Sequence, residues 1–220
     1  SALEHIWSRP KHHEAMANVP RLSPLGNRIA VARDAAFAFA YAQLLAGWRR
    51  RGADLSFFSP LADEAPDESV DSIYLPGGYP ELYAGKLSQA QHFQQSMRRA
   101  ADRGVPIYGE CGGYMVLGET LEDSSGVKHP MLGLLPLETS FAKRKMHLGY
   151  RKLEPLPGSP WQLPLSAHEF HYASIMLEGE AERLFRVRDA LGEELGEAGL
   201  RVGSVAGSFM HVIDFSGENA

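Results

Sequence analysis

Cysteine is nearly absent from this 220-residue sequence, which contains only Cys111. A single thiol excludes an internal disulfide and a zinc site built from several cysteines, and it suits a reducing compartment, so we expect a cytoplasmic protein. Long apolar runs are also missing, which gives no reason to expect a membrane span or a secretory signal. The formal net charge of -5 provides no electrostatic attraction toward nucleic acid or an anionic membrane.

A nucleotide-binding P-loop of the form Gly-x-x-x-x-Gly-Lys-Ser/Thr is missing as well. The sequence begins at Ser1 without methionine, and residues 1–27 combine three prolines with scattered charges and no sustained periodicity. We therefore expect residues 1–27 to be a linker from a preceding domain and residues 28–220 to form one domain. The 44% of hydrophobic residues is enough for an ordinary globular core.

Short apolar segments alternate with helical ones in the first part of this domain. Strands are predicted at 28–32, 54–59, 70–75 and 105–108, and helices at 35–51, 88–103 and from 115 onward, with Asp34 capping the first helix. This alternation is typical of a parallel sheet covered by helices on both faces. After residue 130 the segments are strand-like and joined by short turns. The predicted fold class is therefore α/β, with a flavodoxin-like, mostly parallel sheet and an antiparallel C-terminal extension.

Cys111 lies within Gly-Glu-Cys-Gly-Gly at 109–113, directly after a predicted buried strand and just before a predicted helix. Such a turn holds a nucleophilic side chain in a strained, exposed position and needs small neighbours around it. The N-terminus of the helix favours a thiolate, and its free N–H groups can stabilise an oxyanion. A free cysteine is more often a small buried hydrophobe. The glycine-rich turn nevertheless favours a nucleophile here.

Three motifs together are similar to those of class I glutamine amidotransferases: the turn at 109–113, Pro-Gly-Gly-Tyr-Pro-Glu at 76–81, and the late His211. The segments at 28–37, 57–61 and 168–172 (His-Glu-Phe-His-Tyr) extend the resemblance to the C-terminal domain of the cobyrinic or hydrogenobyrinic acid a,c-diamide synthases. It covers nearly everything from residue 28 to about residue 213.

In that family the cysteine attacks the side-chain amide of glutamine and forms a γ-glutamyl thioester as ammonia leaves. The resemblance implies that Cys111 is the nucleophile, that His211 is the base, and that the N–H groups of Gly78 and Gly112 form the oxyanion hole. It also implies that L-glutamine is the substrate. The corrinoid carboxylate that is amidated, together with ATP and Mg, is expected on a synthetase domain outside this chain, and no cofactor or metal is expected within it.

The third catalytic member stays open. Many class I members carry glutamate two residues after the histidine, whereas this sequence has Ile213 there, and the cobalamin-type group also lacks that glutamate. The role can belong to Glu169, to Asp214 or to a backbone carbonyl. Alternatively, the site has no third member. Glu169 can equally contact the substrate or be a packed polar residue, and Glu110 can contact the substrate or pair locally.

Three alternatives remain on the sequence alone. The same chemistry can serve cobyric acid synthase or another amide ligase, although the segments 32–37 and 168–172 favour the diamide synthase. A cysteine peptidase of the PfpI type usually has its histidine beside the cysteine, where this chain has Gly112. The non-enzymatic alternative is an interaction module that has kept the fold and lost activity.

Overall fold

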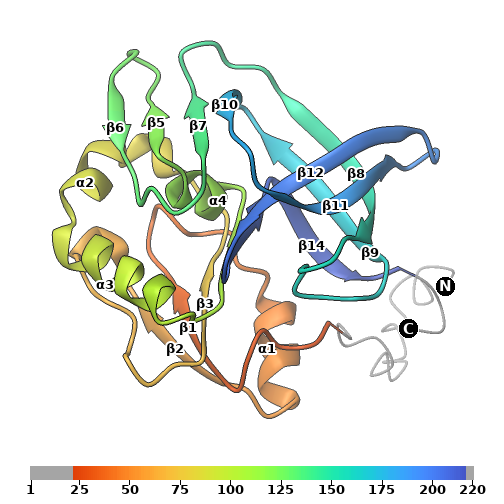
Figure 1. Cartoon of the computed structure of the whole chain (residues 1–220), viewed down its shortest axis with the longest axis horizontal. Coiled ribbons are helices and arrows are strands. Elements are labelled where there is room, and N and C mark those ends of the chain that lie inside the picture. The colour runs from red at the N-terminus through yellow and green to blue at the C-terminus, as the bar shows by residue number, and fades with distance from the viewer. Residues whose placement is uncertain (1–21, 217–220) are drawn as a thin grey trace, which may run out of the picture.

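A computed structural model of the chain describes residues 22–216. Within them, a ten-stranded sheet carries helices on both sides, and a separate four-stranded sheet lies beside it (Figure 1). The helices are α1 (Ala42–Arg50), α2 (Ala84–Gln89), α3 (Gln91–Asp102) and α4 (Gly112–Leu117), with 3₁₀ turns at Pro60–Ala62 and Pro80–Leu82. The strands are β1 (Arg28–Ala32), β2 (Asp54–Phe58), β3 (Ser72–Leu75), β4 (Ile107–Glu110), β5 (Thr120–Glu122), β6 (Lys128–Pro130), β7 (Leu137–Ser140), β8 (His147–Pro155), β9 (Leu165–His171), β10 (Ser174–Glu178), β11 (Glu182–Asp189), β12 (Glu194–Val202), β13 (Val205–Ser208) and β14 (Met210–Phe215).

The parallel half of the large sheet has the strand order β2-β1-β3-β4-β13. Counting β13 as the fifth strand, this is the 2-1-3-4-5 order of flavodoxin-like sheets, which confirms the predicted class. On one face Phe93 and Met97 of α3 enter the hydrophobic core. On the other face Leu44 and Trp48 of α1 pack in a second core. Both faces of the parallel strands are therefore buried, as their apolar sequences require.

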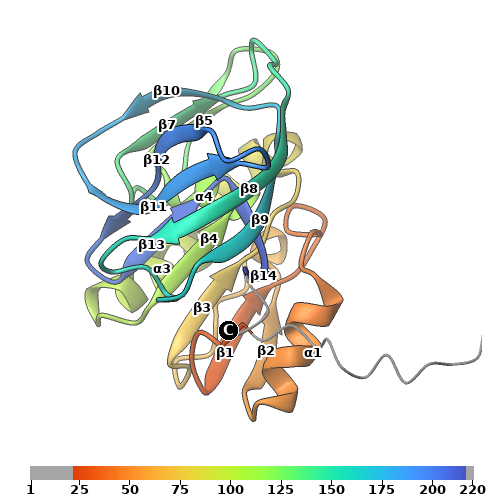
Figure 2. The ribbon, with the colours of Figure 1, turned by 90° about the vertical axis from the view of Figure 1, so that its right-hand side faces the viewer.

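The antiparallel half continues the sheet in the order β14-β9-β8-β11-β12, and β12 pairs with β13. This half confirms the predicted antiparallel extension, and it has as many strands as the parallel half. Figure 2 shows that its strands curve over the parallel part and that β14 lies beside β9. The curl is strong enough for Val212 on β14 to donate a hydrogen bond to Glu110 on β4, at 3.3 Å. Strands far apart in the strand order thus meet in space.

The first helix begins later than predicted, at Ala42 rather than at residue 35. Residues 33–41 instead form a loop, in which Phe37 is buried and Phe39 donates a backbone hydrogen bond to Gly77 at 2.9 Å. The prediction that Asp34 caps the helix is wrong, because its carboxylate accepts hydrogen bonds from Ser59 and from the start of the 3₁₀ turn that follows β2. Tertiary contacts here outweigh the helix propensity of an alanine-rich segment.

The folded unit starts before residue 28. Leu22 is fully buried, the Ser23 carbonyl accepts a hydrogen bond from the Trp161 indole at 2.9 Å, and the Asn27 carbonyl accepts one from Asp54 at 2.7 Å. Residues 22–27 therefore belong to the domain rather than to the predicted linker, whose remaining residues 1–21 lie outside the described part of the chain. Among the described residues, no helix combines the length and the apolar character needed to cross a membrane.

Candidate active site

Cys111 joins β4 to α4 and has a backbone φ of +47°, which is rare for a residue other than glycine. Its N–H donates to the Ser208 carbonyl at 2.8 Å, and its own carbonyl accepts from Met115 at 3.0 Å. The strained strand-to-helix turn expected from the sequence is present. The expected exposure is not, because Cys111 is only 4% exposed and its Sγ lies 3.7 Å from the carbonyl oxygen of Phe170 on β9.

Burial also changes the expected protonation of the thiol. It raises the pKa of Cys111 to about 12, and it outweighs the hydrogen bond from the Gly112 backbone, which lowers that pKa. Helix α4 has only six residues, so its dipole is small. The thiol is therefore protonated at neutral pH, and a base must take its proton during any attack on a substrate.

A loop and a helix start, both containing glycine, converge beside Cys111. The loop is residues 76–78, which follow β3, and the helix is α4. The Gly113 N–H donates to the Pro76 carbonyl at 3.1 Å. A Cβ atom added to Gly112 would lie 2.9 Å from the backbone nitrogen of Gly78, so the two backbones approach more closely than a side chain allows. The two residues predicted to form the oxyanion hole are thus neighbours, and their role stays a prediction.

His211 is buried on β14 and packs against the same loop. A Cβ atom added to Gly77 would lie 2.4 Å from Cε1 of His211, so the ring occupies the space that this glycine leaves. Burial lowers the pKa of His211 to about 4. The ring is therefore neutral near pH 7 and can accept a proton. The curl of the sheet has brought the predicted base to the loop that also borders the predicted nucleophile.

Glu110, for which the sequence left open a substrate contact or a pairing, has its hydrogen-bond partners within the protein. It is fully buried and accepts hydrogen bonds from the Tyr74 hydroxyl at 2.8 Å and from the Val212 N–H at 3.3 Å. Burial raises its pKa to about 8. Because Cys111 follows Glu110 and His211 precedes Val212 in the chain, this carboxyl group connects the two strands that carry the candidate nucleophile and base.

Glu169 lies on the other side of β9 from His211. In the pairing of β9 with β14, Glu169 is directly opposite Met210, whereas His168 is directly opposite His211. Side chains alternate between the two faces of a strand. The pairing therefore turns Glu169 away from His211, and we assign it no part in the catalytic steps below. A substrate contact at Glu169 stays a prediction.

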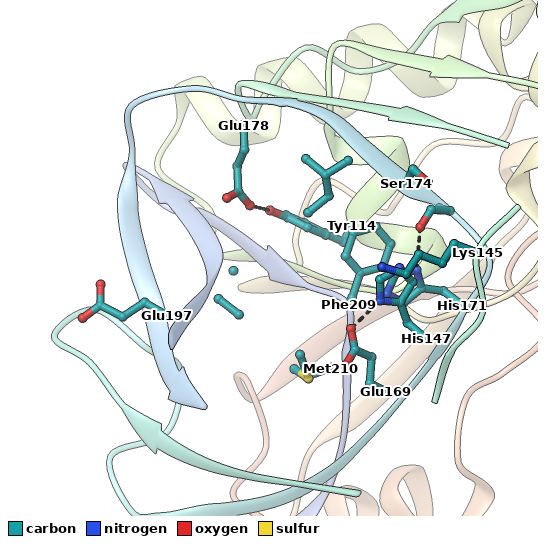
Figure 3. Close-up of a pocket in the computed structure, with 14 residues that line it drawn as sticks. Tyr114, Lys145, His147, Glu169, His171, Ser174, Glu178, Glu197, Phe209 and Met210 are labelled. Atoms are coloured by element: carbon teal, nitrogen blue, oxygen red, sulfur yellow. Dashed lines mark hydrogen bonds and ion pairs between the residues drawn. The ribbon is translucent and has the colours of Figure 1, made fainter. Parts of the chain in front are cut away.

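The described partners of Glu169 are Arg151, at 2.8 Å, and His171, at 3.0 Å. The carboxylate borders a cavity of about 350 Å³. Figure 3 shows this carboxylate pointing toward His171 and His147. The His147 and His171 rings stack with centroids 4.6 Å apart. This cavity is distinct from the one that His211 borders.

His168, which the sequence analysis did not single out, is the residue beside His211. The two rings stack with centroids 4.8 Å apart and an interplanar angle of 27°. The Tyr41 hydroxyl is hydrogen-bonded to Nε2 of His168. Both histidines line a cavity of about 410 Å³ together with Phe39 and Phe170. The alternation along β9 could have placed His168 and Phe170 on one face, but nothing local to the sequence shows which face meets β14.

Comparison of the sequence with known proteins identifies the family of the chain. Residues 28–219 match the CobB/CobQ-like glutamine amidotransferase domain. The chain belongs to this family. Cys111, His211 and the glycines at 77, 78 and 112 all lie within the matched residues.

Relatives in this family are close in sequence. The chain is 74% identical over 219 residues to hydrogenobyrinate a,c-diamide synthase of Brucella anthropi, which covers 100% of the chain and 50% of that relative. It is 63% identical over 203 residues to the protein of the same name from a Sinorhizobium species, covering 92% of the chain and 47% of the relative. The chain thus spans about half the length of the relatives it matches.

Solved structures with this fold are more distant. A glutamine amidotransferase from Thermotoga maritima superposes with a TM-score of 0.56 at 17% identity, covering 84% of this chain and 75% of that one. PurLQS from Thermotoga maritima gives a TM-score of 0.57 at 17% identity, covering 84% of this chain and 87% of the other. At this identity the likeness establishes the α/β fold that class I glutamine amidotransferases share.

Proposed function

We propose that this chain hydrolyses glutamine at Cys111 and supplies the ammonia for a hydrogenobyrinate a,c-diamide synthase. The observation that carries the proposal is the meeting of Cys111, His211 and the 76–78 loop in one place, since it unites a strained nucleophile turn with a buried neutral base. Support for the acceptor comes from relatives of that name that are 74% identical over the whole chain.

In the first step, His211 takes the thiol proton while the Cys111 sulfur attacks the carboxamide carbon of glutamine. The carbonyl electron pair moves onto oxygen and forms a tetrahedral oxyanion. The N–H groups of Gly78 and Gly112 donate hydrogen bonds to that oxygen. Loss of one such donor would raise the barrier by about 3 kcal/mol.

In the second step, protonated His211 gives its proton to the departing nitrogen. The C–N bond breaks, ammonia leaves, and a γ-glutamyl thioester remains on Cys111. Water then attacks the thioester, His211 accepts a proton from the water and passes it to the sulfur, and glutamate is released. The balance is glutamine and water in, glutamate and ammonia out.

We assign the use of ammonia to a part of the protein outside this chain. The sequence contains no P-loop, and the chain spans about half of its relatives, so ATP, Mg²⁺ and the corrinoid carboxylate are expected on a synthetase half. Ammonia would attack the carboxylate after its activation as an acyl phosphate. We expect weak glutaminase activity from the chain alone, because Cys111 is buried and protonated at rest.

The proposal is tested with diazo-oxo-norleucine, an electrophilic analogue of glutamine. Incubation with the protein should add one analogue, with loss of N₂, and peptide mass spectrometry should locate it on Cys111. The Cys111→Ser variant is the matched control and should stay unmodified. Failure of the wild-type protein to form the adduct, even with the synthetase half present, would rule out the amidotransferase assignment.

A further inference from the structure

Two residues that take no part in the proposed catalytic steps, Gly77 and His168, hold the ring of His211 from two sides. Gly77 borders its Cε1 edge, where an added Cβ atom would lie 2.4 Å away. His168 covers one face, with the ring centroids 4.8 Å apart. Glu169, the acidic residue next to His168, belongs to the opposite face of β9 and pairs with Arg151 and His171. The side chain that contacts the face of the His211 ring is thus the imidazole of His168 and not the carboxylate of Glu169.

His168 is itself fixed by Tyr41, which lies in the loop before α1. Burial raises the pKa of Tyr41 to about 12, so its hydroxyl keeps its proton and can donate it in a hydrogen bond. Burial lowers the pKa of His168, which favours the neutral ring. In a neutral ring that accepts from Tyr41 at Nε2, the single ring proton resides on Nδ1. Tyr41 therefore sets both the tautomer and the orientation of His168.

We propose that His168, held by Tyr41, is the positioning residue for the catalytic base His211. The inference rests on the proposed glutaminase function and adds to it the group that orients the base. His168 fixes the rotation of the His211 ring by covering its face, and Tyr41 fixes His168 by its hydroxyl. The three side chains come from the loop before α1, from β9 and from β14, so the fold joins them only when these elements are packed.

Contact through the ring face suits a base that must stay unprotonated at rest. Both nitrogens of an imidazole lie in the ring plane, so a group stacked on the face leaves them free to meet the thiol and the leaving amine. A carboxylate beside the ring would instead favour the charged imidazolium. The stacked neutral ring therefore orients His211 without increasing its resting charge.

The titratable groups around this cluster come from several elements. On β9 they are His168 and His171, which both lower the pKa of His211. Glu110 on β4 and Tyr150 on β8 both act on Tyr41 and raise its pKa. Removal of His168 takes away one of these influences and opens His211 to water, and both effects raise the pKa of His211 toward its ordinary value.

The test measures ammonia release from glutamine as a function of pH for His168→Ala, His168→Phe and Tyr41→Phe. His168→Ala should lower kcat by about 10- to 100-fold, with a much smaller change in KM, because a misplaced base affects the chemical step. It should also move the acid limb of kcat/KM to higher pH. Tyr41→Phe should lower kcat by about 3- to 10-fold, the effect of one neutral hydrogen bond.

His168→Phe keeps an aromatic face and removes the nitrogen that bonds to Tyr41. It should therefore resemble Tyr41→Phe, and combining these two changes should cost no more than either alone. His92→Ala is the matched control: His92 is exposed on α3 and its described hydrogen bond goes to the Asp63 carbonyl, so this variant loses a histidine ring without effect on kcat.

Two results test the positioning role of His168, and a third tests the glutaminase function on which it rests. Wild-type kcat and an unmoved acid limb in both His168→Ala and Tyr41→Phe would overturn the positioning role. If His168→Ala fails to fold, as judged by its thermal unfolding midpoint, Tyr41→Phe and His168→Phe carry the test alone, and non-additive losses support the role while additive losses overturn it. An absent diazo-oxo-norleucine adduct in the wild-type protein would instead reject the glutaminase function itself.

Discussion

Two buried ionisable side chains of the candidate site, Glu110 and His211, are both neutral near pH 7, and burial is the cause in each. It raises the pKa of Glu110 to about 8 and lowers that of His211 to about 4. Together with the protonated thiol of Cys111, they give a site whose three central groups carry no charge at rest. In the proposed mechanism, proton transfer from sulfur to nitrogen thus creates an ion pair only during the reaction, when glutamine is bound.

Glu110→Gln tests the energetic cost of the buried carboxyl group. Because the pKa of Glu110 is raised in the folded state, its contribution to stability is full below about pH 4.5 and is lost as the pH rises toward about 8. The wild-type free energy of unfolding should therefore fall with rising pH by at most about 1.4 kcal/mol per unit relative to Glu110→Gln, whose amide oxygen still accepts from Val212. Urea unfolding at a series of pH values measures this.

Glu193→Gln is the matched control for that comparison, since Glu193 is exposed in the turn between β11 and β12. Its unfolding free energy should follow the wild-type pH dependence. Parallel curves for the wild type and Glu110→Gln would contradict the buried-carboxyl interpretation.

At the scale of elements, motif and periodicity predicted much of the site. The parallel strands, the turn at Cys111 and the glycine loop at 76–78 follow from short-range patterns, since each depends on neighbours in sequence. The start of α1 does not, because residues 33–41 form tertiary contacts such as Phe39 with Gly77. The contact between His168 and His211 could not be predicted from the sequence for a related reason. The pairing of β9 with β14 decides which face of β9 meets His211.

Gly77→Ala is the prediction that belongs to the loop after β3. The added methyl group would meet Cε1 of His211 at 2.4 Å, so the ring must move. We expect kcat for glutamine hydrolysis to fall by about 100-fold, because displacements near 1 Å have effects of that size. Steady-state ammonia release measures it.

Gly85→Ala provides the comparison, because an added Cβ atom in α2 would have its nearest neighbour, His129, at an ordinary 3.5 Å. This variant should keep wild-type kcat. Equal activities for the Gly77 and Gly85 variants would show that the loop does not constrain His211.

At the scale of the whole molecule, the decisive feature is the curl of the large sheet. The hydrogen bond from Val212 to Glu110 joins residues 102 positions apart in the chain. Local patterns specify strands and turns, but they do not specify how far a sheet bends. The family resemblance could therefore assign His211 to the site, whereas the geometry that brings it there required the folded structure.

The proposed partnership with a synthetase half permits a test of the division of labour, made on the two halves together. Cys111→Ala should abolish amidation of hydrogenobyrinate with glutamine as the nitrogen source and leave amidation with added ammonium salt close to wild type. The reason is that the substitution removes the ammonia-producing step alone. Mass analysis of the corrinoid product measures both reactions, and equal loss with the two nitrogen sources would mean that Cys111 supports the fold instead.

His211 belongs to β14, which follows every other described strand along the chain. During translation, Cys111 therefore leaves the ribosome before His211, the residue proposed to deprotonate it. A polypeptide released early, or cut before β14, would contain Cys111 without the proposed base. Under the proposed mechanism, only copies completed through β14 would be able to hydrolyse glutamine.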